Sequence, residues 1–562
     1  MYARIAHFRR AIFVRSRLHL MLALICTSAI ALDTASVASA GVLYDSVTHP
    51  QKHHPDHSNS NGPKNKTPAI VTESGPLKGI INGNITEFLG IPYAAPPVGN
   101  LRWMPPQSFG KWHGLLDAST FGNQCTQGGG GREDCLFLNI YVPNFKKNAN
   151  KHGGAAPVMF WIHGGGLTSG AGSDYDPTPL VNQGVIVVTI NYRLGYLGFF
   201  AQTALDTEGH DAGNYGLMDQ QFAMGWVQRN IGQFGGDPSN VTIFGESAGG
   251  HSVYCNLASP TAAGLFAHAI SESGSYLMFD SFIQSIVTLP VGETQTMGLV
   301  PGGNLVASFL GCTSAACLRA VPNTTLVGLQ PGTLYAFVDG TLLTETPAQA
   351  FASGDFNRVP VMAGTNHDEW RIFVAEQYDA VGKPILTQGE YDAAVFALWG
   401  QGGTGLDLAV EFFYPWAFPG GQILGNNGTD GIFACSARNG DISLSNFTNT
   451  YAYEFNDEHA PPQPPPAGLS FPLGAYHGSE IQYLFDTGFF FEFTPPQQQL
   501  SAAMVSYWTN FAATGDPNGG TLPTWSLYNP TTDVFQSLIP PTPTTETTFN
   551  TNHLCDFWNS IP

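Results

Sequence analysis

The stretch that most constrains the fold runs from residue 241 to residue 250 and reads Val-Thr-Ile-Phe-Gly-Glu-Ser-Ala-Gly-Gly. An apolar, β-rich run leads into a Gly-x-Ser-x-Gly turn centred on Ser247, and small residues follow it. A turn of this kind joins a strand to a helix and holds the serine hydroxyl clear of its own backbone. Glycines are needed two residues before and after Ser247, because side chains there would collide with the neighbouring strand and helix. The stretch therefore predicts a strand, a tight turn and a helix with an exposed serine between them.

A second apolar run ends in glycines at residues 158–166, which read Val-Met-Phe-Trp-Ile-His-Gly-Gly-Gly. A strand followed by His-Gly-Gly-Gly is typical of a loop that binds an oxyanion, because glycine leaves backbone N–H groups accessible. We expect the N–H groups of Gly165, Gly166 and Ala248 to converge on one point. Such donors stabilise the negative oxygen that forms when serine attacks a carbonyl carbon.

A serine nucleophile of this type needs a base, and in this arrangement the chain order is serine, acid, histidine. The chain has sixteen histidines. The best placed is His477, in a loop punctuated by Gly474 and Gly478 that follows a predicted strand at residues 451–455. The residues alone leave three alternative bases, which are His163, His251 and His367.

The acid is expected in the loop after a short apolar strand at residues 359–363. Asp368 and Glu369 both lie in that loop, and composition does not separate them. The Gly-x-Ser-x-Gly turn after a strand is the nucleophile elbow of the α/β-hydrolase fold. We therefore expect a central, mostly parallel, twisted sheet flanked by helices, with large insertions.

Further blocks extend this pattern over nearly the whole chain. They include Phe-Leu-Gly-Ile-Pro-Tyr at 88–93, Glu-Asp-Cys-Leu-Phe-Leu-Asn at 133–139, Asn-Tyr-Arg-Leu-Gly at 191–195, Gly-Asn-Tyr-Gly-Leu-Met-Asp-Gln at 213–220, Phe-Gly-Gly-Asp-Pro at 234–238, His-Gly-Ser-Glu-Ile at 477–481 and Trp-Thr-Asn-Phe at 508–511. Together with 245–249 and 368–369, these blocks resemble the type-B carboxylesterase/lipase family. That family includes cholinesterases, fungal lipases and the non-catalytic neuroligins.

The resemblance implies that Ser247 is the nucleophile, His477 the general base and Glu369 the acid of a fungal-type carboxylic ester hydrolase. One position departs from the family, which often has glycine after the acid where this chain has Trp370. The implied reaction passes through an acyl-enzyme on Ser247 and requires no cofactor and no metal ion.

Cysteine usage is typical of an oxidising compartment. The resemblance implies disulfides between Cys125 and Cys135, Cys312 and Cys317, and Cys435 and Cys555. Cys255 is left over on the helix that follows Ser247, where we expect a small buried apolar side chain rather than a reactive thiol.

The first forty residues have a basic start, a short apolar core at 18–32 and small residues at 38–40, which predicts a signal peptide and a secreted protein. We expect residues 41–67 to be a flexible lead-in and residues 68–562 a single catalytic domain. The histidines of the lead-in are expected to be solvated rather than metal-binding. Glycosylation sequons occur at Asn65, Asn84, Asn323, Asn427 and Asn446, and a further one at Asn240 begins the strand before Ser247, where we expect it to be shielded.

The charge of the chain and the length of one disulfide loop each exclude a class of function. With 42 acidic against 22 basic residues, the chain lacks the basic balance that nucleic acid requires. No stable membrane anchor is expected, and the oligomeric state stays open.

The Cys125–Cys135 loop holds nine residues and no tryptophan, which argues against a cholinesterase and against a lid-gated lipase. Segments 281–302 and 412–418 are alternative lid or pocket segments.

The leading hypothesis is a hydrolase of small or aromatic carboxylic esters. The alternatives are a lipase or sterol esterase that acts at lipid interfaces, and a neuroligin-like binding protein without catalytic activity.

Overall fold

A computed structural model describes residues 69–144, 154–211, 213–276, 303–400, 405–462, 468–488 and 492–561. The predicted signal peptide and lead-in, the sequon at Asn65 and the segment 281–302 lie outside the described residues.

Two sheets form the framework. The smaller has the strands β1 (Ala69–Thr72), β2 (Gly75–Lys78) and β5 (Leu116–Asp117). The larger has the strands β3 (Ile80–Asn82), β4 (Ile85–Pro92), β6 (Phe137–Pro143), β7 (Ala156–Ile162), β8 (Ile186–Ile190), β9 (Gly236–Glu246), β10 (His268–Glu272), β11 (Val361–Asn366), β12 (Thr450–Phe455), β13 (Phe535–Leu538) and β14 (Thr544–Glu546). Their order is β14-β13-β12-β11-β10-β9-β7-β8-β6-β4-β3. Neighbours are parallel from β8 to β13 and antiparallel outside that range.

Alternate side chains of β7 point into two different cores, as the two-residue period of a strand requires. Val158, Phe160 and Ile162 belong to the core on one face of the sheet. Met159 and Trp161 belong to the core on the other face. The strand is buried on both sides, which explains why it is a continuous apolar run in the sequence.

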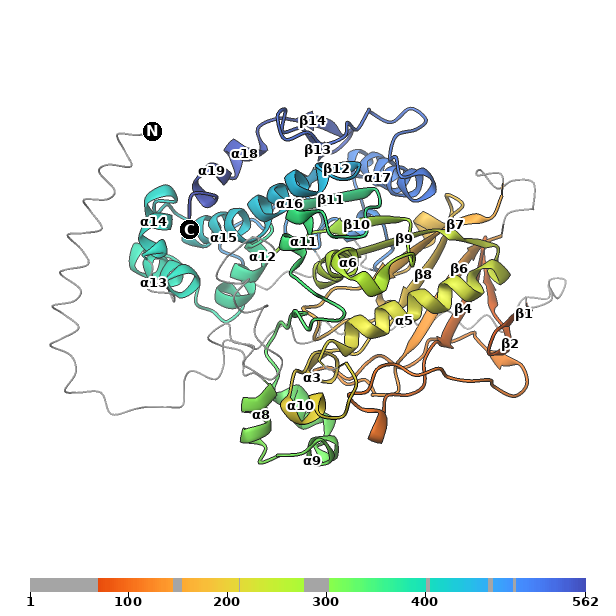
Figure 1. Cartoon of the computed structure of the whole chain (residues 1–562). Helices are drawn as coiled ribbons and strands as arrows, with labels where there is room; N and C mark the ends of the chain where they lie inside the picture. The colour runs from red at the N-terminus through yellow and green to blue at the C-terminus, as the bar shows by residue number, and fades with distance from the viewer. Residues whose placement is uncertain are drawn as a thin grey trace.

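Helices cover both faces of the large sheet (Figure 1). The core that contains Phe160 is closed by α5 (Tyr215–Asn230), α6 (Ala248–Ala258), α11 (Pro347–Ser353) and α16 (Cys435–Ser445). The core that contains Trp161 is closed by α2 (Thr178–Val181) and α17 (Pro495–Thr514). The bounds of α17 follow from its ends, because Thr494 and Gln497 form a capping box and Gly515 stops the helix with φ +74°.

The remaining helices lie mainly around the ends of the sheet. They are α3 (Gly195–Gly198), α4 (Thr203–Asp206), α8 (Gly303–Phe309), α9 (Ala315–Ala320), α10 (Asn323–Leu329), α12 (Arg371–Val374), α13 (Gln388–Trp399), α14 (Leu406–Phe413), α15 (Gly420–Gly428), α18 (Phe549–Asn552) and α19 (Cys555–Trp558). Two π-helical segments are η5 (Ala375–Asp379) and η6 (Thr429–Ala434). Short 3-10 turns are η1 (Gly99–Leu101), η2 (Gly172–Asp174), η3 (Ile231–Phe234), η4 (Pro260–Ala262) and η7 (Ile481–Tyr483).

The parallel strands end at one edge of the sheet. Ile162 at the end of β7 pairs with Gly245 of β9, and Asn366 at the end of β11 pairs with Phe455 of β12. Sites of open α/β sheets lie at the carboxyl ends of the strands. The loops that hold the predicted site residues therefore start from the same edge. The mostly parallel sheet with helices on both faces is an α/β-hydrolase fold.

The structure has disulfides between Cys125 and Cys135, Cys312 and Cys317, and Cys435 and Cys555. These are the pairs that the family resemblance implies. Cys255 is a free thiol, buried in α6. Burial raises the pKa of the Cys255 thiol to about 12, so the group is a neutral apolar side chain.

The predicted glycan at Asn427 is wrong for this structure. Asn427 lies in α15 and is fully buried, and its side chain is held by Trp399 Nε1 at 2.9 Å and by the carbonyl of Ile423 at 3.1 Å. Oligosaccharide attachment needs an exposed amide. Asn240 donates to the carbonyl of Ala513 at 3.1 Å, which is the shielding that its position predicts. Asn84 and Asn446 are exposed and Asn323 is half-buried, so these three stay predictions.

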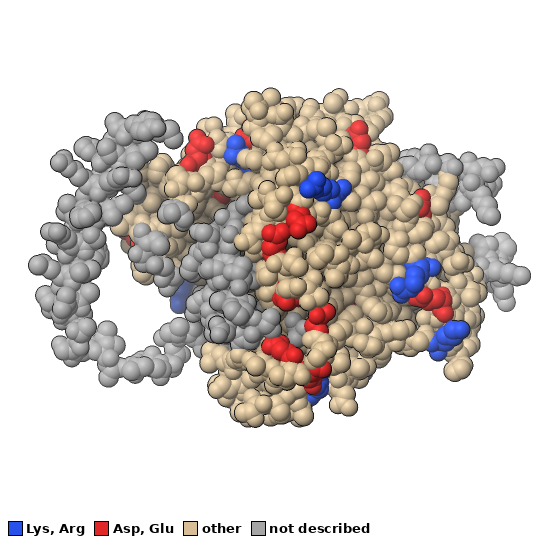
Figure 2. Space-filling view, in the orientation of Figure 1, with Lys and Arg blue, Asp and Glu red and all other residues tan. Residues whose placement is uncertain are grey.

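On the face that Figure 2 shows, the few Lys and Arg side chains are scattered, and several lie beside Asp or Glu side chains. Basic side chains there do not gather into the stripe that a nucleic acid backbone needs. Within the described ranges, every helix is too short or too polar to span a membrane.

Candidate active site

Ser247 occupies the turn between β9 and α6 with a strained backbone, at φ 55° and ψ −121°. It is the half-buried residue in an otherwise buried stretch from 241 to 250. Its N–H donates to the carbonyl of Glu272 at 2.9 Å, and its carbonyl accepts from His251 N–H at 2.8 Å to begin the helix. A Cβ on Gly249 would lie 1.9 Å from the Ile162 carbonyl oxygen, so glycine there is a steric requirement.

His477 and Glu369 form a buried pair beside this turn. Nδ1 of His477 lies 2.5 Å from Oε2 of Glu369, and the N–H of His477 donates to the Glu369 carbonyl at 3.3 Å. Glu369 is held in turn, because its Oε1 accepts from the hydroxyl of Thr365 and from the N–H of Asn366, both at 2.8 Å. The carboxylate thus orients the imidazole and directs Nε2 away from itself.

Asp368, the residue before Glu369, makes different contacts. Its Oδ2 accepts from Ala475 N–H at 2.9 Å, and its Oδ1 forms an ion pair with Arg371 at 2.8 Å. These contacts tie the loop of Asp368 to the loop that precedes His477. The geometry therefore separates the two acids that composition left unresolved, since Glu369 contacts the histidine and Asp368 supports the loop.

The three alternative histidines lie in other environments. His163 is buried, stacks on Tyr192 and contacts the Gly164 carbonyl at 2.8 Å, and burial lowers its pKa to about 4. His251 is buried in α6, where burial also lowers its pKa to about 4. His367 contacts Glu454 at 2.9 Å. In the described residues, Glu369 pairs with His477 and with none of these three.

The glycine loop after β7 lies against the turn of Ser247. A Cβ on Gly164 would lie 3.1 Å from the Cβ of Ser247. Gly165 and Gly166 have φ values of +100° and +62°, and the Gly165 carbonyl accepts from the N–H groups of Thr168 and Ser169 at 3.0 Å. Among the described residues, nothing accepts a hydrogen bond from the N–H groups of Gly165, Gly166 or Ala248. Three free donors therefore remain on this loop and at the start of α6.

The nine-residue disulfide loop supports the glycine loop. The side chain of Gln127 accepts from Gly170 N–H at 2.9 Å and donates to the Gly170 carbonyl at 3.1 Å. The Cys125–Cys135 loop therefore packs beside the glycine loop as a short turn.

A carboxylate that the sequence motifs did not single out faces the imidazole of His477. Glu246 precedes Ser247, is buried, and places Oε1 at 3.3 Å from Nε2 of His477. Burial opposes the imidazolium, but the charges of Glu246 and Glu369 outweigh it and raise the pKa of His477. Burial raises the pKa of Glu246, and the charge of His477 counteracts it. The described residues have no hydrogen bond between the Ser247 hydroxyl and His477.

Two further buried glutamates surround this pair. Glu480 accepts from the side chain of Asn366, and burial holds its pKa well above the usual range. Glu272 accepts from Trp508 Nε1 at 2.8 Å, and burial raises its pKa to about 8. Burial therefore favours the neutral form of both carboxyl groups. The sequence pattern contained Glu246 and Glu480 inside the quoted motifs, yet nothing in it assigned them a contact.

Aromatic rings enclose the imidazole. The ring centres of Phe373 and Phe433 lie 5.1 and 5.0 Å from that of His477. The ring of Trp370 lies 4.7 Å from that of Phe373, tilted by 42°. The bulky residue after Glu369 therefore packs with these aromatic rings and leaves Glu369 in contact with His477. The ring centre of Tyr276 lies 5.3 Å from that of Phe433. The site is apolar apart from its acids.

Comparison with known proteins identifies the family of this chain. The model of the carboxylesterase family matches residues 66–399 and 422–558. Cocaine esterase of Homo sapiens is 33% identical over 538 residues, which cover 85% of this chain and 89% of the relative. Acylcarnitine hydrolase of Mus musculus is 34% identical over 537 residues, with 84% and 88% covered. Fumonisin B1 esterase of Sphingopyxis macrogoltabida is 34% identical over 489 residues, with 81% and 84% covered.

These relatives carry the names of esterases and hydrolases, which favours catalysis over the neuroligin-like alternative. The family model matches most of the chain, and the sheet and helices form an α/β-hydrolase fold. The chain belongs to the carboxylesterase family and is a carboxylic ester hydrolase.

Proposed function

We propose that the protein is a secreted serine carboxylesterase with Ser247 as nucleophile, His477 as base and Glu369 as acid. The observation that carries the proposal is the 2.5 Å contact between His477 Nδ1 and Glu369 Oε2 beside a serine with positive φ. A carboxylate on Nδ1 keeps the proton there and leaves Nε2 free to accept a proton from serine.

In the first half-reaction, His477 Nε2 removes the hydroxyl proton while Ser247 Oγ attacks the ester carbonyl carbon. Nε2 faces Glu246 at 3.3 Å. We propose that it turns toward Ser247 Oγ when an ester fills the site, since catalytic hydrogen bonds often tighten only in the complex. Collapse of the tetrahedral intermediate expels the alcohol, which takes the proton from His477.

The carbonyl oxygen becomes negative in this step, and the N–H groups of Gly165, Gly166 and Ala248 would donate to it. Their lack of acceptors among the described residues supports this role, since donors fixed in advance cost no reorganisation. In the second half-reaction, His477 removes a proton from water, the hydroxide attacks the acyl-enzyme, and the acid leaves as Ser247 regains its proton. Every proton stays on Ser247, His477, water or the leaving group, so the steps balance without a cofactor.

The substrate class follows from the walls of the site. Phe373, Phe433 and Tyr276 offer apolar faces next to Ser247 and His477. Such walls suit small or aromatic acyl and alcohol groups and reject charged ones. The relatives named for cocaine, acylcarnitine and fumonisin B1 support ester hydrolysis as the shared reaction rather than any one of these substrates. Three disulfides support secretion.

One observation favours the lipase alternative. Phe412 and Phe418, in the segment 412–418, are 48% and 71% exposed at and beyond the end of α14. Figure 1 places α14 at one end of the molecule. Exposed aromatic residues of this kind can contact a lipid interface.

Hydrolysis of p-nitrophenyl esters from acetyl to palmitoyl tests the proposal. We expect a preference for short chains and a smooth dependence of rate on ester concentration. A jump in rate above the solubility limit of a long-chain ester would replace the carboxylesterase by the lipase. Failure to hydrolyse any ester of the series would contradict both.

A further inference from the structure

A second cluster of ligating side chains lies beyond the catalytic pair, near the C-terminal disulfide. His367 Nδ1 lies 2.9 Å from Glu454 Oε1, and His553 Nε2 lies 2.6 Å from the same oxygen. The ligating atoms of all three residues lie within 4.8 Å of one another. Their separations along the chain are 87 and 99 residues, so no sequence motif reveals them.

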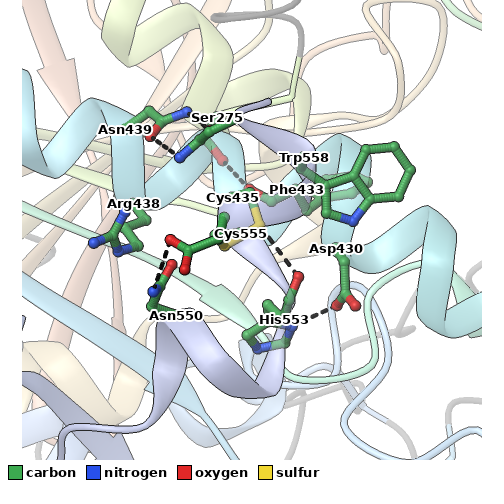
Figure 3. The surroundings of a disulfide bond; sticks show 12 residues. Ser275, Asp430, Phe433, Cys435, Arg438, Asn439, Asn550, His553, Cys555 and Trp558 are labelled. Atoms are coloured by element: carbon green, nitrogen blue, oxygen red, sulfur yellow. Dashed lines mark hydrogen bonds and ion pairs between the residues drawn. A yellow bond between two sulfur atoms is a disulfide. The ribbon is translucent and has the colours of Figure 1, made fainter. Parts of the chain in front are cut away.

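The ring of His553 is oriented as a metal ligand would be. Its Nδ1 lies 2.5 Å from Oδ1 of Asp430, and Asp430 Oδ2 accepts from the hydroxyl of Tyr414 at 2.6 Å. Figure 3 shows Asp430 joined to His553 beside Cys435 and Cys555. A metal-bound histidine usually donates its other N–H to a carboxylate, which fixes the tautomer and leaves the lone pair for the ion.

The carboxylate of Glu454 is oriented as well. Its Oε2 accepts from the side chain of Asn456 at 2.9 Å, so that Oε1 faces both imidazoles. Two ring nitrogens that converge on one buried oxygen bring the rings of His367 and His553 to 5.3 Å between centres. His553 lies between the carboxylates of Asp430 and Glu454, whereas His367 contacts Glu454 alone. One divalent ion between the three ligands would satisfy them all.

An ion can reach the cluster from solvent on one side. The side chains of Glu454 and His553 are 1% and 2% exposed, whereas that of His367 is 30% exposed. The cluster is therefore closed on the side of the core and open on the side of His367. An ion can enter past His367 without unfolding of the sheet.

We propose that His367, Glu454 and His553 bind one divalent transition metal ion of the zinc class, with Asp430 as the carboxylate behind His553. Two imidazoles and one carboxylate suit Zn²⁺ better than Ca²⁺ or Mg²⁺, which prefer all-oxygen sites. Ligating atoms around tetrahedral zinc lie about 3.3 Å apart. Glu454 Oε1 therefore retreats from each ring by about half an ångström on binding, and water completes the coordination.

The bound ion joins three parts of the chain. His367 directly follows β11 and precedes Glu369 by two residues. Glu454 lies in β12, and His553 precedes Cys555 by two residues. The ion would tie the loop of the catalytic acid to the C-terminal segment, beside the Cys435–Cys555 disulfide. Its role is structural, and ester hydrolysis as described above does not pass through it.

The test counts ions on the full-length, oxidised protein. Chelator-treated protein is equilibrated with micromolar Zn²⁺, and bound zinc is measured by mass spectrometry for wild type, His367→Gln and Glu454→Gln. The exposed His113 provides a matched control, His113→Gln. We expect both cluster variants to lose one ion per chain and the control to lose none. Any zinc bound by the histidines of residues 41–67 is the same in every variant. It therefore does not affect the difference in bound zinc between the variants.

A second measurement needs no variant. A zinc-saturated crystal of the wild-type protein is expected to give an anomalous peak about 2 Å from His367 Nδ1, Glu454 Oε1 and His553 Nε2. The melting temperature is expected to rise by a few degrees with zinc in wild type and not in His367→Gln. Equal zinc counts for wild type and both cluster variants, or a zinc-saturated crystal without that peak, would overturn the proposal.

Discussion

Nδ1 of His477 lies 2.5 Å from Oε2 of Glu369, and both side chains are buried from solvent. In such a pair the carboxylate decides which imidazole nitrogen holds the proton. It also stabilises the positive charge that the ring acquires in the transition state. The proposed chemistry depends on this contact more than on any other in the molecule.

Replacing the two acids of the loop separates their roles. Glu369→Gln is expected to lower kcat by about 10³- to 10⁴-fold, because the amide favours the wrong tautomer of His477. Asp368→Asn removes a charge that faces Arg371 and Ala475 N–H, so its main effect is expected on thermal stability. Steady-state kinetics and thermal denaturation of both variants measure this difference. A larger loss of kcat in Asp368→Asn would move the acid to Asp368.

Removal of the Glu246 charge is expected to shift the acid limb of the kcat/KM profile. Activity requires neutral His477, so the rate rises as pH passes upward through the pKa of that residue. Glu246 at 3.3 Å raises the pKa, and Glu246→Gln lowers it. The limb therefore moves to lower pH by about 1 unit. A limb that stays in place or moves upward would show that Glu246 does not act on the base.

The oxyanion loop is tested by Gly165→Ala. Gly165 has φ +100°, and a Cβ there would lie 2.4 Å from the Ser169 carbonyl oxygen. The loop must shift, and we expect kcat to fall by about 10²- to 10³-fold through loss of one donor. Gly110→Ala is the matched control, because Gly110 has φ +84° in open space. Equal activity of the two variants would remove Gly165 from the oxyanion hole.

The C-terminal disulfide is expected to stabilise the fold more than the short ones. Cys435 and Cys555 are 120 residues apart, whereas Cys312 and Cys317 are 5 apart. Loop-closure entropy predicts about 5 kcal/mol for the long loop and about 2 kcal/mol for the short one. Thermal denaturation of the two double Cys→Ser variants compares them, and peptide mapping checks the pairing. A free Cys555 thiol in the oxidised protein would contradict the structure.

Much of the site was predictable because its motifs are local. The strand before Ser247, the glycines around it and the strand of residues 451–455 follow from short-range sterics and from β-rich apolar runs. The structure has β9 and β12 at those places. The choice of Glu369 over Asp368 required the family resemblance, because both acids lie in one loop and only the fold decides which faces His477.

Other features depend on contacts between distant segments and have no local pattern. The contact of Glu246 with His477 joins two segments that are distant in the sequence, and the cluster of His367, Glu454 and His553 joins three. The sequon at Asn427 illustrates the opposite error, because a three-residue pattern carries no information on burial. His367 entered the sequence analysis only as an alternative base, and its true neighbour is Glu454.

The most direct measurement is covalent labelling of the nucleophile. The wild-type protein is treated with a fluorophosphonate and digested, and the modified peptide is identified by mass spectrometry, with Ser247→Ala in parallel. We predict one adduct per chain on Ser247, complete loss of esterase activity with labelling, and an unlabelled, folded and inactive Ser247→Ala. An adduct on another residue, or a Ser247→Ala variant that keeps most of its activity, would contradict the assignment of Ser247.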